Sequence, residues 1–386
     1  MKRWVEKALL GASAVGLGLF LSASQASAHV KWFSSFDVAT APHNLDYLQM
    51  PDFKVLIILS LLFMALGSLL EESPLGAPMM RSFDSVTGWL RTEPDALVRP
   101  VCGFFFIAVW ATGGIILTPE LKTAAPWISW LQLAMAVALI WRVTSPLAAL
   151  GIVVLFGLAV WEYGIFHLAD YPIFLGVAAY LALTGLKRDF YGIRPLDIVR
   201  WTAAITLMWA SIEKWAYPQW SLPLITEHPA LTMGYDSGFF MRAAGVIEFT
   251  LAFALLWTPL VRRAAAVVLA AMFIGACFEF GKLDVIGHSA IVIVLLLIIG
   301  DDVRVQVKRT HMLLAPAGYA AALAGFLTMY YGGHAMLFPP PHVETTAAVQ
   351  TYDEPAADTV RRRGYGSHLI QREPSVSSLD ESRTEH

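Results

Sequence analysis

The residues with the clearest chemical capacity stand at the expected start of the mature chain. Lys2 and Arg3 precede an apolar run over 8–21, and Ala26-Ser27-Ala28 follows as a small-residue cleavage site, a pattern typical of a secretory signal peptide. Cleavage after Ala28 would leave His29 first. Its free α-amino nitrogen and imidazole Nδ1 could then chelate a metal, and one further histidine would complete a set of nitrogen ligands that suits copper. Alternatively, histidine follows the cleavage site by chance.

Other histidines and carboxylates fall near the same ends of the expected helices as this amino terminus. Imidazole and carboxylate groups together are ligands for transition metals. A structural alternative is ion pairing, of Glu213 or Glu248 with Lys214 or Arg242, and of Glu279 with Lys282 at helical spacing. The sequence predicts a metal site, with copper as the cofactor, drawn from His29, His43, His167, His288, His334, Glu162 and Glu279.

Composition decides which elements must position these groups. Hydrophobic residues make up 57 % of the 386 residues, charged residues 15 %, and the mean hydropathy is +0.59. An ordinary soluble domain has a charged fraction nearer a quarter. The chain is therefore expected to be an all-α, polytopic membrane helix bundle, with the lipid bilayer as its surroundings.

Ten apolar runs are long enough to be expected membrane helices, since about 20 residues of helix cross the hydrocarbon core. Ten spans place both ends of the mature chain on the same side. The runs lie near 53–70, 98–117, 125–141, 147–166, 171–186, 197–215, 239–258, 263–280, 285–300 and 314–336.

The basic residues orient this bundle, because cytoplasmic loops are enriched in Lys and Arg. With the amino terminus outside, six basic residues lie in the outer segments: Lys31, Lys54, Lys122, Lys214, Arg242 and Lys282. Thirteen lie inside: Arg81, Arg91, Arg99, Arg142, Lys187, Arg188, Arg194, Arg200, Arg262, Arg263, Arg304, Lys308 and Arg309. We expect a multi-pass protein of the bacterial inner (plasma) membrane with both mature termini in the periplasm.

An internal repeat is expected from two similar helix ends. Trp161-Glu162-Tyr163-Gly164 is followed by His167 and Asp170, and Phe278-Glu279-Phe280-Gly281 is followed by Asp284 and His288. Two tandem repeats of four helices in the same orientation would explain the match, and a shared helix-end packing motif would explain it without duplication.

The expected organisation divides the chain into seven segments. The segments are a cleaved signal peptide (1–28), a periplasmic amino-terminal segment (29–52), a first transmembrane helix with its cytoplasmic loop (53–97), the first four-helix repeat (98–190), the second repeat (191–302), a last transmembrane helix (303–338) and a disordered periplasmic tail (339–386).

Two motifs in the second repeat resemble the DoxX-like family of bacterial membrane proteins. They are Trp209-Ala210-Ser211-Ile212-Glu213-Lys214-Trp215 and Arg242-Ala243-Ala244-Gly245-Val246-Ile247-Glu248. The resemblance covers about 100 residues and implies a four-helix bundle, in a family of which some members are associated with quinone-linked sulfur oxidation. The mature start His-Val-Lys-Trp-Phe also resembles that of uncharacterised bacterial membrane proteins built on such bundles. The added first and last helices depart from the four-helix pattern.

Three functions are compatible with these patterns. The first is a protein that binds a transition metal at the periplasmic face through His29, for metal acquisition, delivery or transport. The second, implied by the resemblance, is a quinone-linked oxidoreductase subunit. The third is a non-catalytic scaffold that recruits a periplasmic protein through its tail.

Several other classes are disfavoured by missing motifs. The chain has no Gly-x-Ser-x-Gly, no His-Glu-x-x-His and no phosphate-binding loop, and it has no basic aromatic patch that would indicate nucleic acid. Cys102 and Cys277 lie inside expected helices, so neither a disulfide framework nor a thiolate cluster is predicted, and both are expected to be small packing residues.

Overall fold

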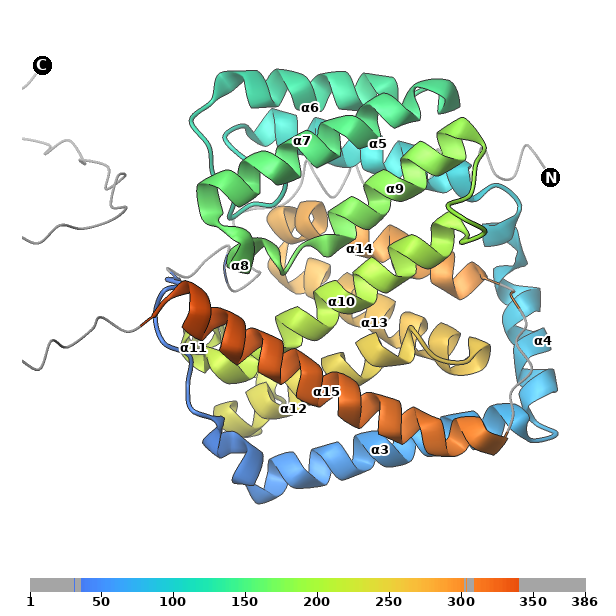
Figure 1. Ribbon diagram of the computed structural model, residues 1–386, viewed down its shortest axis with the longest axis vertical. Helices are drawn as coiled ribbons and strands as arrows, with labels where there is room; N and C mark the ends of the chain where they lie inside the picture. The colour runs from blue at the N-terminus through green and yellow to red at the C-terminus, as the bar shows by residue number, and fades with distance from the viewer. Residues whose placement is uncertain (1–30, 32–35, 302, 304–308, 340–386) are drawn as a thin grey trace, which may run out of the picture. The chain divides into compact units, whose positions relative to one another are not determined.

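The structure is a computed structural model that describes residue 31 and residues 36–301, 303 and 309–339 (Figure 1). The expected signal peptide, His29 and the tail beyond Pro339 lie outside the described residues. Within the described part the ordered elements are helices, with two isolated β-bridges and no strand. The expected all-α class is therefore confirmed.

Each of the ten apolar runs coincides with a helix. These are α3 (Pro51–Glu72), α5 (Pro94–Thr112), α6 (Pro126–Ala138), α7 (Ser145–Tyr163), α9 (Pro172–Leu186), α10 (Pro195–Ala216), α12 (Ser237–Ala254), α13 (Pro259–Phe280), α14 (Lys282–Gly300) and α15 (Arg309–Leu337). Among the described residues, seven helices are both long and apolar enough to cross a membrane: α3, α5, α7, α12, α13, α14 and α15. Of the other three, α6 and α9 have only 13 and 15 residues.

Some expected boundaries and loops were wrong. The run expected to reach residue 117 ends as α5 at Thr112, because Gly113 and Gly114 take positive φ angles of 71° and 64° that a helix cannot contain. The segment between α10 and α12 contains a further helix, α11 (Pro218–Glu227), and the expected loop after α3 contains α4 (Gly76–Thr87). A short helix, α8 (Ile165–Leu168), follows α7.

Local sequence explains where the long helices begin. Proline occupies the first position of α3, α5, α6, α9, α10 and α13. Its fixed φ is already helical, and its missing N–H is one that the first turn leaves without an intrahelical partner. The proline-rich sequence therefore sets the starts of helices without weakening their interiors.

The helices pack in sequence order within each half of the bundle. In the first half α5 contacts α6, α6 contacts α7 and α7 contacts α9; in the second α10 contacts α12, α12 contacts α13 and α13 contacts α14. The halves meet where α9 packs on α10 and α5 on α14, and α15 packs against α3 (Figure 1). The helices α10 and α14 each contribute many buried residues, and their buried faces carry part of the candidate site.

Arginine side chains hold the helix ends together on one side of the bundle. Arg194, before α10, pairs with Asp301, just after α14, at 3.0 Å, and Arg262 in α13 pairs with the same carboxylate at 3.2 Å. Arg99 in α5 donates to the carbonyl oxygen of Leu139 after α6 at 3.0 Å. Each contact joins a residue near the start of one helix to a residue near the end of another, because antiparallel helices bring such opposite ends together. We call this side the arginine end.

The opposite ends of the same helices meet on the other side. Arg242 in α12 pairs with Asp52 in the first turn of α3 at 2.5 Å, and Lys214 in the last turn of α10 pairs with Glu248 of α12 at 2.5 Å. We call this side the cavity end, since it contains the cavity described below.

Replacing Asp301 with Asn should destabilise the protein. The change leaves the guanidinium groups of Arg194 and Arg262 without their shared carboxylate, and the Asp301 and Arg262 side chains are each only 4 % exposed. Loss of one partner from a buried ion pair costs about 3–5 kcal/mol. We expect a clear fall in the thermal unfolding midpoint in detergent, with little change for the exposed control Asp189→Asn. Equal midpoints for the two variants would show that the network does not stabilise the fold.

Candidate functional site

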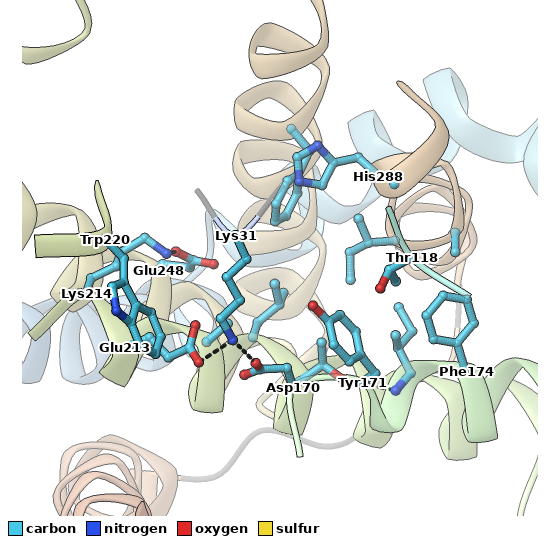
Figure 2. A pocket seen from close by; sticks show the side chains of 18 of the residues that line it. Lys31, Thr118, Asp170, Tyr171, Phe174, Glu213, Lys214, Trp220, Glu248 and His288 are labelled. Carbon is cyan, nitrogen blue, oxygen red and sulfur yellow. Dashed lines mark hydrogen bonds and ion pairs between the residues drawn. The ribbon is translucent and has the colours of Figure 1, made fainter. Parts of the chain in front are cut away.

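A cavity of about 130 Å³ lies at the cavity end, between the two halves of the bundle. Its lining includes Asp170 from the junction of α8 and α9, Glu213 from α10, Glu248 from α12 and His288 from α14, together with Lys31 from the amino-terminal segment (Figure 2). Five separate parts of the chain thus bring ionisable side chains to one small space. Such a concentration of charge inside a helical membrane bundle marks a functional site or a structural pairing.

The Lys31 side chain is enclosed at the centre of this group. Its ammonium pairs with Asp170 and, at 2.5 Å, with Glu213, and the side chain is 3 % exposed (Figure 2). It also lies 5.6 Å from the ring centroid of Trp220 and 5.8 Å from that of Phe36, distances at which aromatic faces attract cations. Burial on its own lowers the pKa of Lys31, but the two carboxylates outweigh burial and hold the pKa above its ordinary value, so the amine stays charged.

Glu120 is a buried carboxylate beside this pair. It stands in the turn between α5 and α6, where an isolated bridge joins Ile115 and Lys122, and it is 6 % exposed. The Thr118 hydroxyl and the backbone N–H of Glu120 are hydrogen-bond donors beside this carboxylate, and both act to lower its pKa. Burial raises the pKa of Glu120 to about 7, although the nearby charge of Lys31 acts to lower it. The group therefore gains or loses a proton near neutral pH.

His167 is a buried side chain whose ring nitrogens lack hydrogen-bond partners among the described residues. It lies in α8, is 2 % exposed, and its ring stacks on that of Phe36 with centroids 5.2 Å apart. Burial, together with the charge of Lys31, lowers the pKa of His167 to about 3. The imidazole is neutral at physiological pH and keeps a lone pair for a proton or a ligand.

The segments 209–215 and 242–248 supply ion pairs at this end. Of the ion pairs considered from the sequence, the one between Glu248 and Lys214 is present, at 2.5 Å. Arg242, a second expected partner, pairs instead with Asp52, and Glu213 pairs with Lys31. These contacts join helices that are distant in the sequence, so the motif residues stabilise the bundle as well as line the cavity.

A group of potential metal ligands lies where α13 meets α14. The Sγ of Cys277 and one ligand atom each from Asp284 and His288 all lie within 4.8 Å of one another. Gly281, whose φ is 79°, separates the two helices. Cys277, in the last turn of α13, therefore lies next to the first turns of α14. Asp284 and His288 are four residues apart and share a helix face, with His288 Nδ1 2.8 Å from the Asp284 carboxylate. Thiol, imidazole and carboxylate side chains together can bind a transition metal.

The other predicted ligands occupy separate places. His43 is exposed, Glu162 is exposed, and Glu279 interacts with His228 at 3.0 Å. The Nε2 of His334 lies 3.1 Å from the carbonyl oxygen of Val38. Within the described residues, the group of three potential ligands includes His288 and none of the other predicted ligands, while His29 lies outside the described part.

Sequence reasoning missed the groups that the fold places with Lys31 and His288. Cys277 was expected only to pack, yet its thiol lies beside Asp284 and His288. Glu120 was not singled out, because one Glu in a turn between apolar runs gives no signal of burial. A usable signal for Cys277 was its position one turn before Gly281, with Asp284 three residues after that glycine.

The two similar helix ends have similar local geometry. Gly164 and Gly281 each end a long helix with positive φ, 83° and 79°, and each is followed at once by another helix. Beyond the first glycine the chain presents His167 and Asp170, and beyond the second Asp284 and His288, and all four side chains are buried. The shared break therefore positions a histidine and an aspartate in each half of the bundle.

Glu120→Gln should stabilise the protein at high pH. The pKa of Glu120 rises from 4.5 to about 7 on folding, so the native state holds a proton that the unfolded chain releases. Ionisation of the native carboxyl therefore lowers stability as pH rises from about 4.5 through 7, by at most about 3 kcal/mol. Glutamine has no such ionisation. The thermal midpoint of the variant should exceed that of the wild type at pH 8 and approach it at pH 5.

The exposed carboxylate Glu162 offers a matched control for that experiment. Glu162→Gln should leave the thermal midpoint close to the wild-type value at both pH values. If Glu120→Gln shifts the midpoint equally at pH 5 and pH 8, the carboxyl does not titrate between them and the argument from burial fails.

No protein-family model, curated protein or solved structure matches this chain. What the molecule does must accordingly be inferred from the cavity, the ligand group beside it and the membrane helices that position them.

Proposed function

We propose that this is a bacterial inner-membrane protein that binds a transition metal at its periplasmic side, for metal acquisition, delivery or transport. Copper is the metal that we propose. The observation that carries the proposal is the group of Cys277, Asp284 and His288, whose ligand atoms lie within 4.8 Å of one another. His288 also lines the cavity that holds Lys31. The ligand group and the charged cavity are thus parts of one site.

The chemistry of the three ligands favours a soft or borderline metal. Thiolate ligands select Cu(I) and zinc, and imidazole suits copper and zinc. Bonds from such metals to sulfur or nitrogen are about 2.0–2.3 Å long, so a metal between the three side chains needs only small rotations of groups already within 4.8 Å of one another. Three protein ligands leave a position open, as in sites that exchange their metal or bind a further ligand.

The expected amino-terminal ligand would lie close to the same cavity. Lys31 is fixed there by Asp170 and Glu213, and only two peptide units separate it from His29 in the sequence. Two residues of chain reach at most about 7 Å. A metal held by the amino group and imidazole of His29 would therefore be within reach of this end of the bundle.

The arrangement of charges supports the proposed orientation. Arg194, Arg262 and Asp301 join helix ends at the arginine end, which is rich in the basic residues expected in the cytoplasm. The cavity end would then face the periplasm, together with both mature termini. In this topology all ten helices cross the membrane, including the shorter α6 and α9 and the more polar α10.

The size of the cavity favours an ion over a quinone. About 130 Å³ is less than the roughly 300–1,000 Å³ of sites that enclose drug-sized ligands. The quinone-linked role that the DoxX-like resemblance implies would need this cavity to widen or would use a second pocket of about 490 Å³, which His43, Lys214 and Arg242 help to line. A scaffold would need no cavity. Glu248 lines the cavity, whereas Glu162 and Glu279 are exposed, so these three carboxylates do not form one transport path. Binding and delivery therefore have more support than transport.

Metal analysis of purified variants tests the proposal. We expect copper-loaded wild type to hold about one or two copper ions per chain, Cys277→Ser and His288→Ala each to lose the ion held by the ligand group, and His29→Ala to lose the amino-terminal ion. Cys102→Ser is the matched control, because Cys102 is the second free cysteine and is buried away from the ligand group.

Mass spectrometry of the mature amino terminus should accompany that measurement, since the chelate exists only if His29 comes first. Copper content that is unchanged in Cys277→Ser, His288→Ala and His29→Ala alike would contradict the proposal. So would a wild-type protein that holds no copper after loading.

A further inference from the structure

The second pocket, of about 490 Å³, is also at the cavity end of the bundle. Three parts of the chain line it: His43, Asp46 and Met50 from the segment before α3, Lys214 from the last turn of α10, and Met241 and Arg242 from the first two turns of α12. Its volume falls within the roughly 300–1,000 Å³ of sites that bind small organic ligands. The pocket is therefore large enough for an organic group.

The polar side chains of this pocket have hydrogen-bonding capacity that their contacts leave unused. An ammonium has three N–H donors and a guanidinium has five. Lys214 contacts one carboxylate, that of Glu248, and Arg242 donates from Nε and Nη2 to a single oxygen of Asp52. The pocket thus offers free N–H donors to an anionic oxygen.

The segment before α3 brings a group of opposite charge to the same pocket. Asp46 lines the pocket, and its carboxylate is exposed, with no hydrogen bond or ion pair to any other described residue. A purely anionic ligand would place its charge near this carboxylate with nothing to compensate it. A ligand with both an anionic and a cationic group would satisfy both sides of the pocket.

The pocket lies where the headgroups of lipids would be. The 22 residues of α3 make a helix of about 33 Å, slightly longer than the roughly 30 Å of the hydrocarbon core, and Met50 of the pocket directly precedes this helix. Beyond it Val55, Ile58 and Leu59 are each more than half exposed, an apolar surface that acyl chains would cover. This step rests on the proposed membrane placement, but not on metal binding.

We propose that the second pocket binds the headgroup of a membrane phospholipid that carries a phosphate and a primary ammonium, as phosphatidylethanolamine does. The phosphate oxygens would accept hydrogen bonds from Lys214 and Arg242, since both side-chain types bind phosphate. The ammonium would donate to Asp46, and the acyl chains would lie along α3. Because Lys214 also lines the cavity that holds Lys31, the bound lipid would lie beside the candidate site.

Native mass spectrometry of the delipidated full-length protein in detergent tests this inference with three lipids that have identical acyl chains. We expect the wild type to bind phosphatidylethanolamine about tenfold more tightly than phosphatidylglycerol or phosphatidylcholine, the equivalent of one hydrogen bond between charged groups. The glycerol headgroup has no cation, and the quaternary ammonium of choline has no N–H for Asp46. Asp46→Asn should remove this preference, while the control Glu227→Gln, an exposed acid outside the pocket lining, should keep it.

The basic side of the pocket has its own test. Lys214→Gln should weaken the binding of phosphatidylethanolamine and phosphatidylglycerol alike by about tenfold, because both phosphates lose a charged partner, whereas Lys214→Arg should retain binding. Should Lys214→Gln fail to fold, the comparison of Asp46→Asn with Glu227→Gln decides the question. Cys277→Ser should bind the lipid as the wild type does, so that failure of copper binding and failure of lipid binding are distinguished.

Three results would overturn the proposal. The first is equal binding of the three lipids by the wild type, and the second is a preference for phosphatidylethanolamine that persists in Asp46→Asn. The third is displacement of the lipid by O-phosphoethanolamine at the same concentrations as by phosphatidylethanolamine itself, because the acyl chains would then contribute nothing and the ligand would be a soluble phosphate ester.

Discussion

The cost of placing charge inside an apolar bundle governs this structure. A charged group within the helices must find an opposite charge or give up its ionisation, and the protein meets this requirement at the ends of the helices. Arginine and aspartate side chains pair at the arginine end, as in Arg262 with Asp301, and lysines meet glutamate and aspartate at the cavity end, as in Lys31 with Asp170 and Glu213. The helix interiors between them remain apolar and pack closely.

The two ends bury charge with different side chains. At the arginine end Asp301 is shared by two guanidinium groups, each of which donates to it. At the cavity end the ammonium of Lys31 lies between two carboxylates, and neither ring nitrogen of His167 has a hydrogen-bond partner among the described residues. Buried polar atoms without partners are positions where a ligand, a proton or ordered water can enter. Such atoms occur at both ends, since the buried Nε atoms of Arg99, Arg200 and Arg262 also lack partners within the described residues.

Two glycines that end long helices position the residues of the candidate site. Gly164 and Gly281 each separate two consecutive helices without a long loop. The residues just beyond each glycine therefore fold back under the helix that precedes it. Asp170 reaches Lys31 by this route, and Asp284 and His288 reach Cys277. The same local feature thus positions a buried histidine and a buried aspartate in each half of the bundle.

The sequence by itself determined the helices, because hydrophobic length, proline starts and glycine breaks are local properties of the chain. It also indicated that Glu248 either pairs with another helix or is protonated, since no basic residue stands beside it on α12. The identity of the partners was decided only by tertiary packing. Lys31 and Glu213 are 182 residues apart, Arg242 meets Asp52 across 190, and Glu120 is enclosed by segments from elsewhere in the chain. Periodicity reveals which face of a helix is polar, but not which distant polar face it will meet, because that choice depends on how all the helices pack together.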